Sequence, residues 1–273
     1  MKAELDLFTQ RPIQSSILGT CEVVHKPIAS LDNPSSIEFA ILGRGDTYRD
    51  LSSVQLRLRI KLLKDNNNGL LDNTSNIGVV NNILHSLFRQ CTVYLNGKAV
   101  SQSDINYHYR SYIETLLNYG NDAASTHLES VGWFMDKGNF DSIETNKNSG
   151  LDSRKALLKN SEEIELIGQL HADIFNQNKL LLNNVDLRIV LSLEKPEFYI
   201  MEADTGTAHI KILDASLHMN EVKVNPNILL AHRNVLEKQN AVYPYKRVEV
   251  KSFTVPKGNS SLSFDNLVFY RIF

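Results

Sequence analysis

The clearest pattern along the chain is a two-residue alternation of apolar and polar side chains between positions 54 and 62. The apolar positions are Val54, Leu56, Leu58, Ile60 and Leu62, and the polar positions between them are Gln55, Arg57, Arg59 and Lys61. Successive side chains of a β-strand point to opposite faces of its sheet, so this pattern predicts a strand with one buried and one solvated face. The polar row is basic, but it lacks the interleaved aromatic side chains that stack on nucleic-acid bases. We therefore interpret it as a solvated strand face.

Shorter runs with similar alternation predict further strands. They occupy residues 36–42, 164–168, 185–193, 208–222 and 247–256. Helical spacing is rarer and covers only short segments, at residues 79–88 and 228–236. Many short strands with few helices are typical of β-sandwiches. The pattern therefore predicts an all-β sandwich with short helices and long loops.

Residues 90–120 combine a hairpin signal with a helical one. Asn96-Gly97 separates two β-prone runs, and both residue types tolerate the positive φ angles of a type I′ turn. Ser103 or Asp104 is expected to cap the helix that follows, and Gly120 to end it. Apolar residues recur in that helix at three- and four-residue spacing, on one face: Tyr109, Tyr112, Ile113, Leu116 and Leu117. Because so short a helix cannot form a core, we expect it to plug one end of the β-structure.

Two regions lack a clear pattern. Residues 1–35 contain Pro12, Pro27 and Pro34, which interrupt regular structure, and we interpret them as an N-terminal arm, either lying on a neighbouring subunit or disordered. Residues 121–160 are rich in Asn, Ser, Asp and Gly and are predicted to form a long loop inserted in a domain over residues 36–240. The sole tryptophan, Trp133, is expected to anchor the base of this loop.

The composition agrees with a folded domain and narrows the range of partners. The chain has 273 residues, 42% of them hydrophobic, with a net charge of −2 and two cysteines. Such a charge gives no overall field that attracts DNA or a membrane. The N-terminus lacks signal-peptide character, and no run approaches the roughly 18 apolar residues of a membrane span. We expect a soluble intracellular protein that is not secreted, with Cys21 and Cys91 as small buried residues.

The sharpest candidate for chemistry is His171-Ala172-Asp173. A His-x-Asp pair with a later histidine, here His209 or His218, is the ligand set of non-haem iron oxygenases, which bind Fe(II) and leave positions open. However, no arginine for an oxo-acid stands at a suitable distance, and the sequence lacks nucleophile-elbow, phosphate-loop and paired-cysteine motifs. We therefore expect no metal, no cofactor and no catalytic site, which favours a structural or binding module over an enzyme.

Several motifs together resemble one family. The first joins Leu95-Asn96-Gly97 to Tyr107-x-Tyr109-Arg110-x-Tyr112-x-Glu114-x-Leu116-Leu117-x-Tyr119-Gly120. The second, and most specific, is Gly168-x-Leu170-His171-x-Asp173-x-Phe175-x-Gln177, followed by Leu181-Leu182-Asn183-x-Val185-Asp186-Leu187. Both are similar to segments of the double jelly-roll major capsid proteins of Polinton/Maverick elements and adintoviruses. The resemblance covers nearly the whole chain, but only about the first half of the family's length.

The resemblance implies a jelly-roll β-sandwich, the first of a double jelly roll, in a structural protein of a virion. It implies a homotrimeric capsomer that contacts neighbouring capsomers and a penton protein, without cofactor, catalysis or nucleic-acid specificity. Residues 241–273 would be the start of a second jelly roll, so we expect a truncated product that does not form native capsomers alone. We expect structural or interaction roles for Tyr109, Arg110, Tyr112, Trp133, Phe134 and Phe175.

Two other interpretations of the function remain open. One is a single jelly roll that binds a ligand such as a carbohydrate, for which Trp133 and Phe134 are the candidate aromatic pair. The other is the iron oxygenase, with His171, Asp173 and His209 as its ligands.

Overall fold

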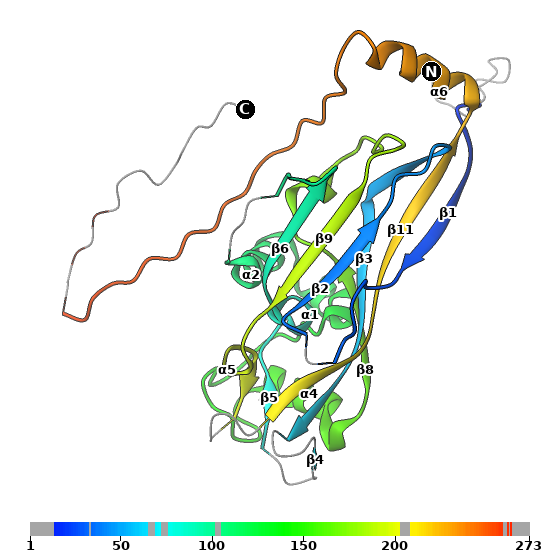
Figure 1. Ribbon diagram of the computed structural model, residues 1–273. Coiled ribbons are helices and arrows are strands. Elements are labelled where there is room, and N and C mark those ends of the chain that lie inside the picture. The colour runs from blue at the N-terminus through cyan, green and yellow to red at the C-terminus, as the bar shows by residue number, and fades with distance from the viewer. Residues whose placement is uncertain are drawn as a thin grey trace, which may run out of the picture.

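The structure is a sandwich of two antiparallel sheets with short helices at its sides (Figure 1). A computed structural model describes residues 14–32, 34–64, 69–71, 76–101, 105–202, 208–258, 261 and 263.

The first sheet is built around the long strand β3 (Thr47–Lys64). One edge of β3 pairs with β11 (Ala208–Val224), which pairs in turn with β1 (Ile17–His25). The other edge pairs with β8 (Ile164–Gln169) and with the two-residue strand β4 (Gly69–Leu70). The apolar row at positions 54–62 faces the core, and all five of its side chains are fully buried. The predicted alternation is therefore confirmed.

The second sheet has the strand order β2 (Ser36–Ile41), β9 (Leu187–Leu193), β6 (Phe88–Leu95) and β7 (Lys98–Ala99). Its inward side chains, such as Phe39 and Ile189, join those of β3 in a single core. Successive long strands alternate between the sheets, since β1, β3, β8 and β11 belong to the first and β2, β6 and β9 to the second. This is jelly-roll connectivity, so the predicted jelly-roll fold is confirmed.

The turn between β6 and β7 is the one that the sequence predicts. Asn96 and Gly97 have φ angles of 48° and 77°, both in the left-handed region that a type I′ turn requires. The Asn96 side chain also accepts a hydrogen bond of 2.8 Å from the backbone N–H of Asp186. The hairpin is thereby tied to the start of β9.

Residues 121–160 are more regular than predicted. They contain α3 (Asn121–Ala124), the 3₁₀ helix η3 (His127–Val131) and α4 (Ser149–Leu157), followed by η4 (Lys159–Ser161). The Asn148 side chain caps α4, and the buried Arg154 pairs with Asp136 at 2.9 Å. Capping and the buried ion pair order this region, and Leu128, Val131 and Leu158 anchor it in the core without a regular spacing along the sequence.

Short elements fill the connections between the long strands. Strand β5 (Gly78–Val79) pairs with β10 (Ile200–Met201), which follows α5 (Pro196–Tyr199). The helix predicted over residues 79–88 is reduced to α1 (Ile83–Ser86), because Val79 pairs with β10 and Phe88 already belongs to β6. The helix predicted near residue 228 is confirmed as α6 (Pro226–Leu236).

Both ends of the chain differ from expectation. Residues 17–25, assigned to the arm, form β1, because the edge of β11 opposite β3 is free to pair with them. Residues 1–13 lie outside the described part of the chain. Residues 247–256, predicted as a strand, are extended but join neither sheet. An alternating sequence becomes a strand only where another strand offers its backbone groups, and here side chains bind this segment instead.

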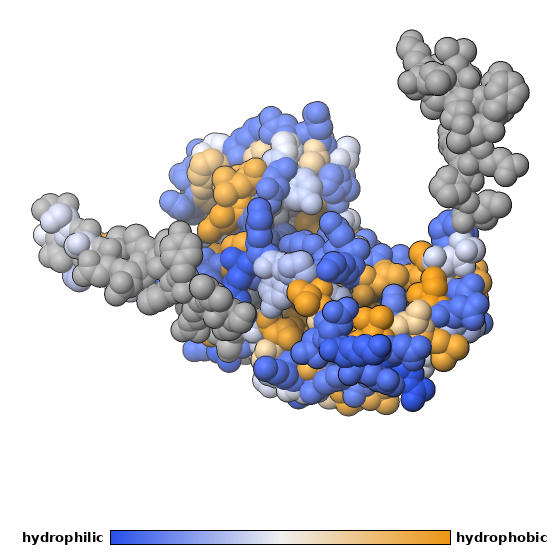
Figure 2. All heavy atoms as spheres, turned by 90° about the horizontal axis from the view of Figure 1, so that it is seen from above, coloured by the Kyte–Doolittle hydropathy of each residue, from blue (hydrophilic) through white to orange (hydrophobic). Residues whose placement is uncertain are grey.

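The surface mixes polar and apolar patches. Figure 2, which views the molecule from above, shows hydrophobic areas interspersed with hydrophilic ones. Among the exposed large hydrophobic residues are Leu230, Val235 and Leu236 of α6. Within the described residues, no helix has the length and apolar character needed to cross a membrane.

Candidate functional site at helix α2 and the groove beside strand β8

Helix α2 (Tyr107–Asn118) is turned with its polar side inward. Its buried residues are Tyr107, His108, Ser111 and Thr115. The five apolar residues whose spacing predicts the helix are exposed, from 37% for Tyr112 to 77% for Leu117. The helix therefore forms where predicted, but its apolar face points away from the core, so that face does not plug the sandwich. Ser103 and Asp104 lie outside the described residues, and Asn106 occupies the N-cap position.

A network of charged side chains holds α2 in this orientation. Arg110 donates hydrogen bonds to Glu114, at 2.8 Å, and to Asp173, at 2.5 Å. The other carboxylate oxygen of Glu114 lies 2.7 Å from Nδ1 of His171. Asp173 begins η5 (Asp173–Asn176), which follows β8 in the chain. The network therefore joins the inner side of α2 to the segment between β8 and β9.

Burial and pairing change the acidity of these groups. Burial alone would raise the pKa of the Glu114 carboxyl, but hydrogen bonds from His171 and Arg110 outweigh it and hold that pKa below its usual value. Burial also opposes the charge of Arg110, yet the bond to Asp173 and the nearby carboxylates raise the pKa of the guanidinium. Both groups are therefore charged at neutral pH, as an ion-pair network requires.

His85 and Tyr107 form a buried layer beneath this network. Nδ1 of His85 lies 3.0 Å from the Tyr107 hydroxyl, which also accepts a 3.3 Å hydrogen bond from the backbone N–H of His171. The His85 and His171 rings meet edge to face, with centroids 4.6 Å apart. Burial and the neighbouring His171 hold the pKa of His85 well below its usual value. His85 is therefore a neutral structural residue at neutral pH.

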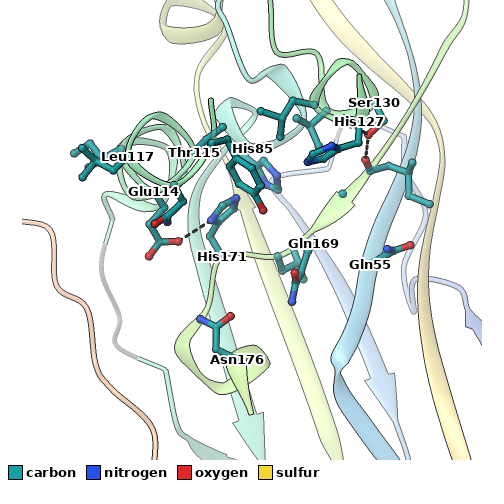
Figure 3. A pocket seen from close by; sticks show the side chains of 18 of the residues that line it. Gln55, His85, Glu114, Thr115, Leu117, His127, Ser130, Gln169, His171 and Asn176 are labelled. Atoms are coloured by element: carbon teal, nitrogen blue, oxygen red, sulfur yellow. Dashed lines mark hydrogen bonds and ion pairs between the residues drawn. The ribbon is translucent and has the colours of Figure 1, made fainter. Parts of the chain in front are cut away.

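A groove of about 630 Å³ lies between α2 and the open edge of β8 (Figure 3). The Ser130 hydroxyl, from η3, donates a 2.9 Å hydrogen bond to the carbonyl of Ile167 in β8. In Figure 3, Glu114 points toward His171, whereas Leu117 points away from it on the outer side of α2. The residues that line the groove are mostly polar or small and include Gln55, Glu114, His127, Ser130, Gln169 and His171.

The structure does not bring the candidate iron ligands together. His171 and Asp173 are bonded to Glu114 and Arg110 of α2, while His209 lines a different pocket together with Tyr199. His218 lies 2.5 Å from Glu22 on β1. Within the described residues, no three His, Cys, Asp or Glu side chains form a group that could hold a metal ion. The His-x-Asp pair is part of the α2 network, and the structure does not bring either later histidine to it.

The extended C-terminal segment, residues 242–250, is fastened to the jelly roll by side chains; we call it the strap. Asp173 accepts from the backbone N–H of Val248, with both oxygens at 3.3 Å. Asn106 donates to the carbonyl of Val250 at 3.0 Å, and Gln177 to that of Pro244 at 2.7 Å. The strap therefore belongs to the surroundings of α2, and Asp173 serves both the strap and the helix.

The remaining predicted residues are structural supports or lie on the surface. Phe175 is fully buried and Trp133 is 3% exposed, so both belong to the core. Trp133 contacts the exposed Tyr112, with ring centroids 5.0 Å apart. The backbone carbonyl of Phe134 accepts hydrogen bonds from Asn81 and Arg154. Because Trp133 is buried, it cannot stack on a sugar, and the proposed aromatic pair of a carbohydrate site is not formed.

The two cysteines differ from each other. Both are free, and Cys91 is buried as expected whereas Cys21 is exposed. Burial raises the pKa of the Cys91 thiol to about 12, so this cysteine is an inert core residue.

The spacing of apolar and polar residues in the sequence did not predict the polar contacts of α2. The only local signal was the Arg110–Glu114 pair, whose four-residue spacing places both side chains on one side of a helix. Their partners His171 and Asp173 are 57 and 63 residues away in sequence. Periodicity could not reveal which side of α2 these partners face.

Comparison with curated proteins shows similarity to a distant relative. An uncharacterized protein of Caenorhabditis elegans is 24% identical over 182 residues, which cover 66% of this chain and 42% of the worm protein. No protein-family model matches the chain.

The solved structures that resemble this chain include proteins of viruses. A chain in the 3.5 Å cryo-EM structure of the Sputnik virophage aligns with a TM-score of 0.52 and 11% identity, over 83% of this chain and 52% of its own length. The mavirus major capsid protein aligns with a TM-score of 0.42 and 14% identity, over 82% of this chain and 49% of its own. The Sputnik alignment supports the jelly-roll fold. This chain spans about half the length of these structures and less than half of the worm protein.

Proposed function

We propose that this chain is a structural subunit of a viral capsid. The observation that carries the proposal is the jelly-roll fold of the two sheets, on which a Sputnik virophage chain aligns over 83% of this chain. A fold alone does not specify function, so residue patterns are needed as a second line of support. In this proposal the chain acts through shape and buried area, without catalytic turnover or a cofactor.

The residue motifs favour one kind of virus. The segment from Gly168 to Leu187 and the segment from Leu95 to Gly120 resemble the double jelly-roll capsid proteins of Polinton/Maverick elements and adintoviruses. Within that proposal the parent protein forms a homotrimeric capsomer, contacts neighbouring capsomers and a penton protein, and resides in the virion after an intracellular stage. The structure adds a physical role for the second motif, since His171 and Asp173 position α2 and the strap.

The test is to ask whether the chain occurs in particles. Extracts of cells that produce it are separated on a density gradient and probed with an antibody against the chain, and each fraction is treated with nuclease. We expect the chain to sediment with nuclease-protected double-stranded DNA and immunogold to label regular particles. Sedimentation of all the chain as free protein, away from any protected DNA, would overturn the capsid role.

A further inference from the structure

The outer face of α2 is an apolar surface that nothing in the described structure covers. We define it as Ile105, Tyr109, Tyr112, Ile113, Leu116, Leu117 and Tyr119. At 100° per residue the five of these positions that lie within α2 span an arc of about 140° around the helix axis, and Ile105 and Tyr119 flank the two ends of the helix. Amphipathic helices of globular proteins normally turn such an arc toward the core, and α2 turns it outward.

This orientation is built into the molecule. Turning the apolar arc inward would break the bonds of Arg110 to Asp173 and of Glu114 to His171. It would also break the 3.2 Å hydrogen bond from Asn82 to the Ser111 hydroxyl and leave buried polar groups without partners. The contacts on the inner side of α2 thus fix the rotation of the helix about its own axis. That rotation leaves the outer face exposed.

The outer face is also held ready for contact. Each of its tyrosine rings packs against a ring of a neighbouring element, Tyr109 on Phe198, Tyr112 on Trp133 and Tyr119 on His127. Side chains that are already ordered lose less conformational entropy when a partner binds. Tyrosine is enriched in protein interfaces, because its ring supplies area and its hydroxyl can form a hydrogen bond at the rim.

The charge and size of the face indicate the kind of partner. The charged residues of α2 are Arg110 and Glu114, and both belong to the inner network. The seven side chains are on average about half exposed, and with about 200 Å² for each large side chain they offer roughly 700 Å². A standard interface buries about 800 Å² on each partner. An uncharged face of this size can pack on its own copy without bringing like charges together.

We propose that the outer face of α2 is a self-association surface, and that its occupant is the same face of a second copy of this chain. This inference rests on the proposed function only in that copies of the chain must meet; the choice of face comes from the orientation of α2. The contact deepens the capsid proposal, because a same-face contact is two-fold and so specifies a contact between copies other than those within one trimer.

The first experiment measures self-association by sedimentation velocity between about 1 and 100 μM. The test variant is Leu117→Glu, and the matched control is Leu42→Glu, because Leu42 is 73% exposed and lies outside the outer face. Circular dichroism verifies that both variants fold. We expect the wild-type chain and Leu42→Glu to associate alike, and Leu117→Glu to associate at least about tenfold more weakly, since it places a charge in an apolar interface.

The second experiment locates the contact. In a Cys21→Ser background, Leu116→Cys places a thiol near the middle of the outer face, and Leu42→Cys serves as control. Under mild oxidation we expect disulfide-linked dimers from Leu116→Cys and monomers from Leu42→Cys.

Three outcomes would overturn the inference. The wild-type chain could stay monomeric throughout, as expected if a different protein covers the face. It could also associate equally well with Glu at position 117 or 42, or the Leu116→Cys chain could fail to cross-link. None of these outcomes changes the result of the density-gradient experiment, so the capsid proposal can hold even if this contact does not form. The contact can likewise form even if the chain is absent from particles.

Discussion

At the scale of single residues, Asp173 connects more of the site than any other group in the α2 network. Its carboxylate accepts from Arg110 on the helix and from the backbone N–H of Val248 in the strap. The Asp173 side chain is only 7% exposed, so its carboxylate bonds to these partners rather than to water. Removing the charge leaves Arg110 buried with an incomplete set of partners, and a buried pair that loses one member is strongly destabilised.

We therefore expect Asp173→Asn to lower the free energy of unfolding by about 2–4 kcal/mol, measured by urea denaturation. The matched control is Glu165→Gln, which breaks an Arg57–Glu165 pair of similar geometry whose side chains are about half exposed. Solvent screens that pair, so its loss should lower the free energy of unfolding much less than Asp173→Asn does. Equal costs for the two variants would contradict the role assigned to Asp173.

His85 should make the stability depend on pH. Its pKa is well below the usual value of about 6.5 because it is buried next to His171. As the pH falls below about 6.5, His85 binds a proton in the unfolded chain but not in the folded chain. The free energy of unfolding therefore decreases, by up to about 1.4 kcal/mol per pH unit. We expect His85→Gln to flatten this slope between about pH 6.5 and 5. Tyr107→Phe, which keeps a titratable His85, should retain it; an unchanged slope in His85→Gln would refute the assignment.

At the scale of elements, β8 depends on a close approach that only glycine permits. A Cβ atom at Gly168 would lie 2.4 Å from Cγ1 of Val131 in η3 and 2.9 Å from Cδ2 of Leu84 in α1. The glycine lets both short helices pack directly on the outermost part of the first sheet. This explains in physical terms why a glycine stands at the first position of the motif that runs from Gly168 to Gln177.

Gly168→Ala should therefore destabilise the fold by about 1–3 kcal/mol through overpacking, as measured by the midpoint of thermal unfolding. Gly19→Ala in β1 is the matched control, because a Cβ there meets nothing within 4 Å. We expect that control to keep the wild-type midpoint or raise it slightly. A wild-type midpoint in Gly168→Ala would mean that η3 and α1 can move away from β8 at little cost.

At the scale of the whole molecule, the strap closes the side of the sandwich next to α2. Tyr245 donates a 3.0 Å hydrogen bond to the carbonyl of Val100, and Val248 lines a small pocket together with Cys91 and Tyr107. The strap thus links the region after β7 to η5 and covers part of the core. It therefore contacts the first jelly roll, while the family resemblance implies that residues 241–273 begin a second one.

A chain that stops after Ala241 should lose these bonds and unfold about 5–10 °C lower than the full chain, as followed by circular dichroism. A chain that stops after Pro256 keeps the strap and should match the full chain. Equal melting temperatures for both shortened chains would mean that the strap adds no stability.

The sequence by itself determined the features that depend on neighbouring residues. The alternation at positions 54–62 predicts β3, since every second side chain must enter the core. Asn96-Gly97 predicts the hairpin, because only a few residue types adopt its φ angles. The ordered motifs also predicted the jelly-roll class, which the strand connectivity confirms.

Only the tertiary structure decided which way α2 faces, where residues 247–250 lie and what His171 and Asp173 do. The spacing of Tyr109, Ile113 and Leu116 reveals an apolar face but not its partner, because that partner need not belong to the same chain. The orientation is set by the Glu114–His171 and Arg110–Asp173 pairs, whose members are separated by 57 and 63 positions in the sequence. Pairs so far apart produce no periodic pattern along the chain. Likewise, β1 forms because β11 has a free edge, and the strap stays out of the sheets because side chains bind its backbone.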